Sequence, residues 1–190
     1  MSIVLYLGRT VKEYKEISGG RIKALLSGGT LQCELCLRPM RRHSSYVRGI
    51  AETGEEIEIT MVWCRKCKNW HALLPDFLLP NKHYSGNEVE DVIIASGTES
   101  ALQIETKASE STVLRWIREI GEGIGRAIGI IKYEFLRIGS GISEIAIDAK
   151  TDYGRLEQIL EMAPREIKYS GNKLGLANIW LGASGREAHI

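Results

Sequence analysis

The sequence predicts an α+β fold: small β-hairpins that carry paired cysteines come first, a three-helix segment follows, and the C-terminal region is helical and partly irregular. Three observations support this prediction. Two Cys-x-x-Cys pairs stand in the first half of the chain, the segment around Ile57 alternates apolar and polar residues, and apolar residues recur at helical spacings from Val113 to Ile138. We therefore divide the chain into residues 1–30, 31–84, 85–138 and 139–190.

The N-terminal segment, residues 1–30, is predicted to form a short strand followed by a helix. The pair Gly28-Gly29 ends the helix, and Gly19-Gly20 is expected to interrupt it. The apolar residues that can share one face of this helix are Val11, Tyr14, Ile17, Ile22, Leu25 and Leu26.

Residues 31–84 are predicted to form short strands and a connector. Ile57, Ile59 and Met61 alternate with polar residues, as in a strand with one buried face, and a turn is expected at Thr53-Gly54. Pro75 and Pro80 bracket a short apolar connector, which these prolines prevent from forming a long helix.

Residues 85–138 are predicted to hold three helices. Ser85 and Glu88 have the spacing of a capping box, so the first helix is expected to run from about 86 to 96. A second short helix fits residues 100–107, and a third begins near Glu110. Because glycine weakens a helix by about 1 kcal/mol relative to alanine, a break near Gly121 is expected.

The C-terminal region, residues 139–190, has a less regular pattern. Asp152 to Ala163 is predicted to be helical, and Pro164 follows it. The remainder is glycine-rich with isolated apolar residues, and the sequence assigns it no role.

The four cysteines of the chain, Cys33, Cys36, Cys64 and Cys67, predict one metal site. Each Cys-x-x-Cys pair can form a tight knuckle that presents two thiolates, and two knuckles complete a tetrahedral shell with Zn–S distances of about 2.3 Å. Four protein ligands leave no position for a reacting water. The pattern therefore predicts a zinc ribbon in which Zn²⁺ is structural and stabilises a small segment.

Other interpretations of the cysteines remain open. The pairs could be redox-active dithiols, although no thioredoxin-like βαβ pattern surrounds them, or unliganded core cysteines. An iron–sulfur cluster also accepts four thiolates. His71 follows Cys67 by four residues and could compete as a ligand.

Composition and charge narrow the class of protein. The N-terminus lacks the basic region of a secretory signal, and no run of about 18 apolar residues predicts a membrane helix. We therefore expect a cytoplasmic protein with no membrane partner. The formal net charge of +1 gives no argument for nucleic-acid binding, which must come from local patches.

A basic segment lies between the two cysteine pairs. It carries Arg38, Arg41, Arg42 and Arg48 without an acid, and Tyr46 could stack on a base or a sugar. Guanidinium groups suit phosphate oxygens, so the segment is a candidate DNA contact. A solvated charged hairpin explains the same pattern.

The third predicted helix begins like the recognition helix of a helix-turn-helix. Its outward residues would be those that reach base edges or phosphates in the major groove. However, four acids and three bases lie between Glu99 and Gly121, so a plain helical bundle is the alternative. The candidate DNA-reading residues are Glu110, Ser111, Thr112, Arg115 and Arg118.

The stretch from Cys64 to Pro80, followed by Tyr84-Ser85, resembles an uncharacterised bacterial family that is related in layout to the DNA-binding N-terminal regions of insertion-sequence transposases. That family couples a zinc ribbon, a His-Ala-Leu-Leu-Pro connector and a helix-turn-helix. The resemblance covers roughly residues 31–120. It implies that the four cysteines bind zinc and that residues 110–118 read duplex DNA.

The chain departs from a full transposase. Such enzymes need spaced carboxylates that hold two metal ions, and the roughly 50 residues after Ile138 offer no such set. We expect a non-enzymatic DNA-binding protein, transposase-associated or regulatory.

Two other functions stay open. One is a protein–protein module that uses the apolar connector, or a remnant of a transposase without its nuclease domain. The other is an enzyme with an unrecognised chemistry. The sequence does not specify the DNA sequence that is bound or the oligomeric state.

Overall fold

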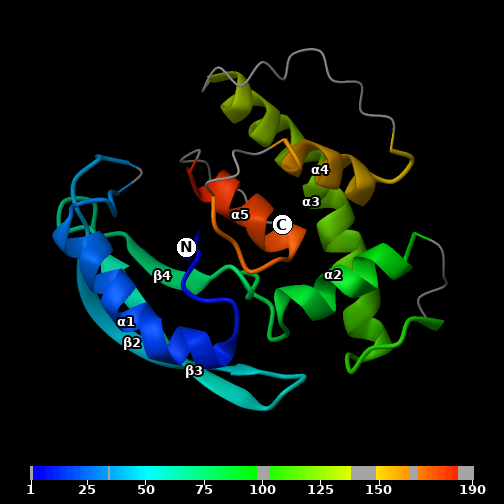
Figure 1. The fold of residues 1–190 in the computed structure, drawn as a ribbon, viewed down its shortest axis with the longest axis horizontal. Coiled ribbons are helices and arrows are strands. Elements are labelled where there is room, and N and C mark those ends of the chain that lie inside the picture. The colour runs from blue at the N-terminus through cyan, green and yellow to red at the C-terminus, as the bar shows by residue number, and fades with distance from the viewer. Residues whose placement is uncertain (1, 34, 98–102, 138–148, 163–166, 184–190) are drawn as a thin grey trace.

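The computed structural model describes residues 2–33, 35–97, 103–137, 149–162 and 167–183. It confirms a mixed α+β protein, with a four-stranded sheet and five helices in this part of the chain (Figure 1). The strands are β1 (Ser2–Leu5), β2 (Arg41–Ile50), β3 (Glu55–Trp63) and β4 (Trp70–Pro75). The helices are α1 (Val11–Ser27), α2 (Gly86–Ala95), α3 (Glu110–Arg137), α4 (Asp152–Leu160) and α5 (Lys173–Ala183).

The sheet has the strand order β1-β4-β3-β2. The three strands β2, β3 and β4 are antiparallel neighbours, whereas β1 pairs in parallel with β4 through Ile3 and Leu73. The predicted turn at Thr53-Gly54 joins β2 to β3, and Gly54 has a positive φ of 70°. The N-terminal strand therefore adds a fourth strand to the sheet formed by β2, β3 and β4.

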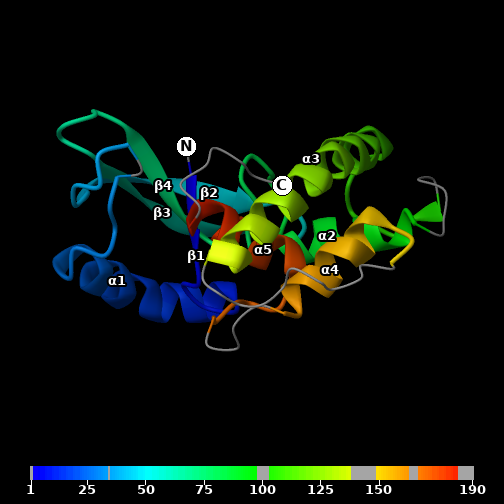
Figure 2. The same cartoon turned by 90° about the horizontal axis from the view of Figure 1, so that it is seen from above.

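Helix α1 covers one face of this sheet (Figure 2). Thr10 caps its N-terminus by accepting a hydrogen bond from the Glu13 N–H, and Tyr14 and Ile22 are buried on its inner side. The predicted interruption at Gly19-Gly20 is wrong, because the helix continues through both residues. Packing of the apolar face outweighs the low helix propensity of two exposed glycines.

Helix α2 begins as predicted, with the Ser85 hydroxyl accepting from the Glu88 N–H. The reciprocal half of the capping box is absent from its described contacts. The Ser85 N–H donates to Glu52, and the Glu88 carboxylate instead accepts from Thr106 and Lys107. Glu88 therefore ties the start of α2 to the loop that leads into α3.

The three-helix arrangement differs from the prediction. The described residues 103–109 contain no α-helix, and residues 98–102 of the predicted second helix lie outside the described residues. Helix α3 runs without a break to Arg137, so the expected break near Gly121 is wrong. Its buried residues from Val113 to Ile131 are all apolar, including Ile120 and Ile124, while Gly121 stands on the exposed side.

The buried apolar residues form two hydrophobic cores. Those up to Leu78 belong to the first core, and those from Leu79 onward belong to the second. The first lies within the sheet, α1 and the cysteine knuckles, and the second lies among α2, α3, α4 and α5. Helix α5, which the sequence did not predict as an element, packs on both α3 and β1 and so joins the two cores.

A buried carboxylate fastens this junction. Asp76 follows β4 directly, and its carboxylate accepts hydrogen bonds from the N–H and the hydroxyl of Ser170 at 2.5 and 2.7 Å. Burial raises the pKa of Asp76 above its ordinary value. The main-chain oxygen of Asp76 also accepts from Asn172, at the start of α5.

Among the described helices, none combines the length and apolar character that crossing a membrane requires.

Candidate metal centre

Two matching knuckles present the cysteines. In the first, the Cys33 N–H donates to the Arg38 carbonyl at 2.9 Å and the Leu37 N–H donates to the Cys33 carbonyl at 2.7 Å. In the second knuckle, the Cys64 N–H donates to the Asn69 carbonyl at 3.0 Å and the Lys68 N–H donates to the Cys64 carbonyl at 2.7 Å.

The backbone closes both knuckles in the same way. Leu37 and Lys68, the residues directly after the second cysteine of each pair, have positive φ values of 55° and 57°. The left-handed conformation is uncommon for residues other than glycine, so its occurrence at equivalent positions marks a shared local geometry. Each knuckle thus turns its two thiols to the same side.

The fold brings the two knuckles together at one end of the sheet. The first knuckle precedes β2, and the second joins β3 to β4, so pairing of these strands places the knuckles side by side. The four sulfur atoms lie within 4.8 Å of one another, and Cys36 Sγ is 3.5 Å from Cys64 Sγ. Tetrahedral coordination with metal–sulfur bonds of about 2.3 Å places sulfur atoms about 3.8 Å apart. This cluster of thiols can therefore hold one metal ion.

The environments of the thiols shift their pKa values in different directions. The Cys67 N–H lowers the pKa of Cys64 to about 7, because it donates toward the thiolate. A hydrogen bond with the Cys36 thiol raises the pKa of Cys67 to about 12, and burial raises the pKa of Cys33. A cation bound among the four sulfurs would stabilise all four thiolates and displace their protons.

His71 lies near this end of the sheet but outside the sulfur cluster. It is 1 % exposed, and neither ring nitrogen has a hydrogen-bond partner within the described residues. Burial lowers its pKa, so the ring is neutral at pH 7. Among the residues that the structure describes, the group close enough to share an ion consists of the four cysteines.

The basic residues predicted to contact DNA fall into two groups. Arg38, Arg41 and Arg42 are exposed at the cysteine-bearing end of the sheet. Arg48 requires a correction: it is only 9 % exposed, and its guanidinium donates to the main-chain oxygens of Leu79 and Lys82. Arg48 therefore holds the connector against β2 and is not available to a phosphate.

The residues predicted to read DNA stand at the other end of the molecule. Both views place the first turn of α3 and the cysteine knuckles at opposite ends of the long axis (Figures 1 and 2). Of the five, Glu110, Ser111, Arg115 and Arg118 are exposed and Thr112 is half-buried, while Val113 and Trp116 pack inward. The structure thus does not bring the two sets of DNA candidates into one site.

Sequence reasoning missed an aromatic cluster beside the knuckles. Trp63 and Trp70 pair across β3 and β4 with ring centroids 5.4 Å apart, and His43 lies edge-on to Trp70 at 4.1 Å. His43 is the extra residue of a bulge in β2, which directs its ring toward the tryptophans. Trp70 is 42 % exposed. The signal was present: the tryptophans flank the second cysteine pair, where strand pairing brings them together.

The apolar connector is buried. Leu73, Leu74, Phe77, Leu78 and Leu79 are each at most 6 % exposed, in the two cores. The protein–protein alternative depended on this segment being exposed, so it loses its main support.

Comparison with known proteins adds a family match without a function. Residues 33–116 match a family model described as "Domain of unknown function (DUF6431)". This range begins at Cys33, contains all four cysteines and ends at Trp116 in α3. No curated protein and no solved structure matches the chain.

Proposed function

We propose that this protein is a non-enzymatic, zinc-stabilised DNA-binding protein, transposase-associated or regulatory, whose DNA contact lies at the knuckle end of the sheet. The convergence of four sulfur atoms within 4.8 Å carries the proposal, because it fixes the segment that presents the exposed cations and rings.

Zinc is the metal that these ligands favour. Four cysteine thiolates in a tetrahedral arrangement favour Zn²⁺ or an iron–sulfur cluster. An iron–sulfur cluster must fit several iron and sulfide atoms between its ligands, whereas sulfurs this close leave room for a single ion. All four ligands come from the protein, so the ion would support a zinc ribbon rather than catalyse a reaction.

The charge distribution supports DNA as the partner. Six exposed cations occupy the knuckles and the adjoining start of β2: Arg38, Arg41, Arg42, Arg65, Lys66 and Lys68. The described residues 35–51 contain no acid, and Glu55 and Glu56 lie at the far end of the β2–β3 hairpin. Glu58, farther along β3, meets the exposed Arg42 at 3.9 Å and offsets part of this charge. The hairpin is therefore positive where the knuckles are.

The exposed rings add a second kind of contact. Cations bind phosphates in any sequence, while aromatic faces stack on bases. Trp70 and His43 are exposed among these cations, so both kinds of group occur on one surface.

Fluorescence anisotropy with a labelled 30-base-pair duplex tests the proposal. The zinc-loaded wild type is expected to bind at low salt and to weaken steeply as salt rises, because phosphate contacts release counterions. The double variant Arg38→Ala/Lys66→Ala, one substitution in each knuckle, should weaken binding about tenfold to a hundredfold and reduce the salt slope by about 2.

The matched control is Arg115→Ala/Arg118→Ala on α3, which removes the same number of charges at the other end. Unchanged binding by this variant supports the knuckle surface, whereas loss of binding by it alone would assign DNA contact to α3. A single strand of the same sequence is measured in parallel, and tighter binding to it would replace duplex DNA with single-stranded DNA as the partner. Failure of the wild type to bind either at low salt refutes the proposal.

A further inference from the structure

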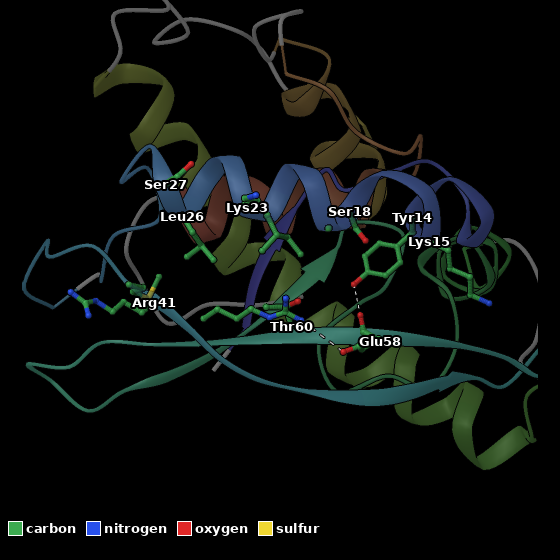
Figure 3. A pocket seen from close by; sticks show the side chains of 13 residues that line it. Tyr14, Lys15, Ser18, Lys23, Leu26, Ser27, Arg41, Glu58 and Thr60 are labelled. Atoms are coloured by element: carbon green, nitrogen blue, oxygen red, sulfur yellow. Dashed lines mark hydrogen bonds and ion pairs between the residues drawn. The ribbon is translucent and has the colours of Figure 1, made fainter.

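A groove separates α1 from the β2–β3 hairpin, on the face of the sheet that α1 covers (Figure 3). Its volume is about 720 Å³, within the range of roughly 300–1,000 Å³ that small-molecule sites occupy. Tyr14 closes the floor by donating from its hydroxyl to the Glu58 carbonyl at 2.7 Å. Figure 3 shows Ser18 and Leu26 on the side of α1 that faces the strand carrying Glu58 and Thr60.

The floor of the groove is apolar with a few hydroxyls. Ile22 and Met40 are buried along it, and Leu26 is half-buried. The hydroxyl-bearing residues Ser18 and Thr60 are 9 % and 6 % exposed. Such a floor suits the apolar body of a ligand and offers isolated polar contacts that fix its orientation.

The rims of the groove are strongly cationic. Lys15 and Lys23 extend from α1, and Arg41 and Arg42 from β2, against one acid, Glu58. Arg42 meets Glu58 at 3.9 Å, where both side chains are exposed, so this ion pair is weak. The other three cations form no ion pair within the described residues. The lining therefore carries four cations against a single carboxylate.

We propose that this groove binds a small amphipathic anion, a free medium-chain carboxylate, with its chain on the apolar floor and its acidic head among the rim cations. Charge complementarity selects the acid, and the buried floor selects the chain. The inference does not depend on DNA binding: Arg41 and Arg42 border both surfaces, whereas Lys15, Lys23 and the apolar floor belong to the groove alone.

Two neighbouring glycines of α1 allow a clean test. A Cβ at Gly19 or at Gly20 would meet no atom within 4 Å, so both accept a side chain without a clash. Gly19 lines the groove and Gly20 does not. Leucine at either site also raises helix propensity, so neither Gly19→Leu nor Gly20→Leu is expected to unfold the protein.

Isothermal titration of the zinc-loaded full chain uses decanoate as the probe, with decanol and inorganic phosphate as comparisons. Decanoate is expected to bind at least tenfold more tightly than either. Gly19→Leu should weaken decanoate binding at least tenfold, because the leucine occupies the groove, while Gly20→Leu binds as the wild type does. Lys23→Gln should weaken decanoate and leave decanol unchanged.

Several results would overturn the inference. Equal binding of decanol and decanoate would remove the role of charge, and full competition by phosphate would remove the role of the chain. Equal behaviour of Gly19→Leu and Gly20→Leu would place the ligand elsewhere. DNA binding is measured on the same proteins. If Gly19→Leu still binds DNA but no longer binds decanoate, the two sites are separate. Displacement of decanoate by a single-stranded oligonucleotide would instead assign the groove to nucleic acid.

Discussion

Removal of the metal is expected to unfold the knuckle end of the sheet. Structural zinc contributes an apparent binding free energy of about 10–16 kcal/mol in zinc-finger peptides, which matches or exceeds the total stability of a typical domain. Without the ion, four thiols crowd together in a region that two short loops must hold. Hydrogen exchange should therefore lose protection from residue 31 to the start of β4 after chelation. The second core, around α3, should keep more of its protection, because it is separate from the first.

A pair of substitutions in one knuckle provides the control for chelation. Cys36→Ser removes one ligand and should lower the zinc affinity and the midpoint of thermal unfolding. Leu35→Ser changes the neighbouring residue, which is 71 % exposed, and should change neither. Full protection of the knuckles in the presence of excess chelator would contradict this prediction.

The metal affinity should fall as the pH falls. With their pKa values raised, Cys33 and Cys67 hold protons at neutral pH when no metal is bound, so the ion must displace protons to bind. Each step toward acid increases that competition, and Cys64, with a pKa of about 7, joins it in the same range. Competition with a chelating dye at pH 6, 7 and 8 should show tightest binding at pH 8.

The second large effect concerns two glycines that lie in helices but respond oppositely to alanine. A Cβ at Gly175, in the first turn of α5, would overlap the main-chain oxygen of Asp76 and crowd the Asn172 side chain. A Cβ at Gly129, in α3, would meet nothing within 4 Å. Gly175→Ala should therefore destabilise the protein by about 3 kcal/mol or more, because backbone must move apart at the junction of the two cores.

Gly129→Ala should stabilise the protein by about 1 kcal/mol, because it improves helix propensity without strain. Urea unfolding of the two variants measures both signs in one experiment. Equal stabilisation by both would show that α5 is not packed against Asp76.

The sequence predicted the parts of the fold that local patterns control. The cap at Ser85, the alternation around Ile57 and the inner face of α3 follow from spacing alone, and the structure has all three. The two Cys-x-x-Cys pairs also predicted that the four thiols lie close together, because two such pairs commonly supply the four ligands of one metal ion. These features depend on a few neighbouring residues.

Features that depend on distant packing were missed or misread. The glycines in α1 and at Gly121 suggested breaks, but burial of the opposite face decides whether those helices continue. Helix α5 has a composition without a clear polar face, because it lies between two cores. The sequence suggests that Arg48 is a free cation, but its guanidinium donates a hydrogen bond to the Leu79 carbonyl in the connector. The groove beneath α1 needs segments far apart in the chain, so no local pattern marks it.

Zinc K-edge absorption on freshly purified protein, combined with elemental analysis, tests the central claim most directly. We expect one zinc per chain with four sulfur neighbours at about 2.3 Å. A shell of three sulfurs and one nitrogen at about 2.0–2.1 Å would indicate that His71 is a ligand. That result would contradict the structure, in which His71 lies outside the sulfur cluster. Protein that contains no zinc, or sulfur atoms that fail to share one ion, would contradict the account.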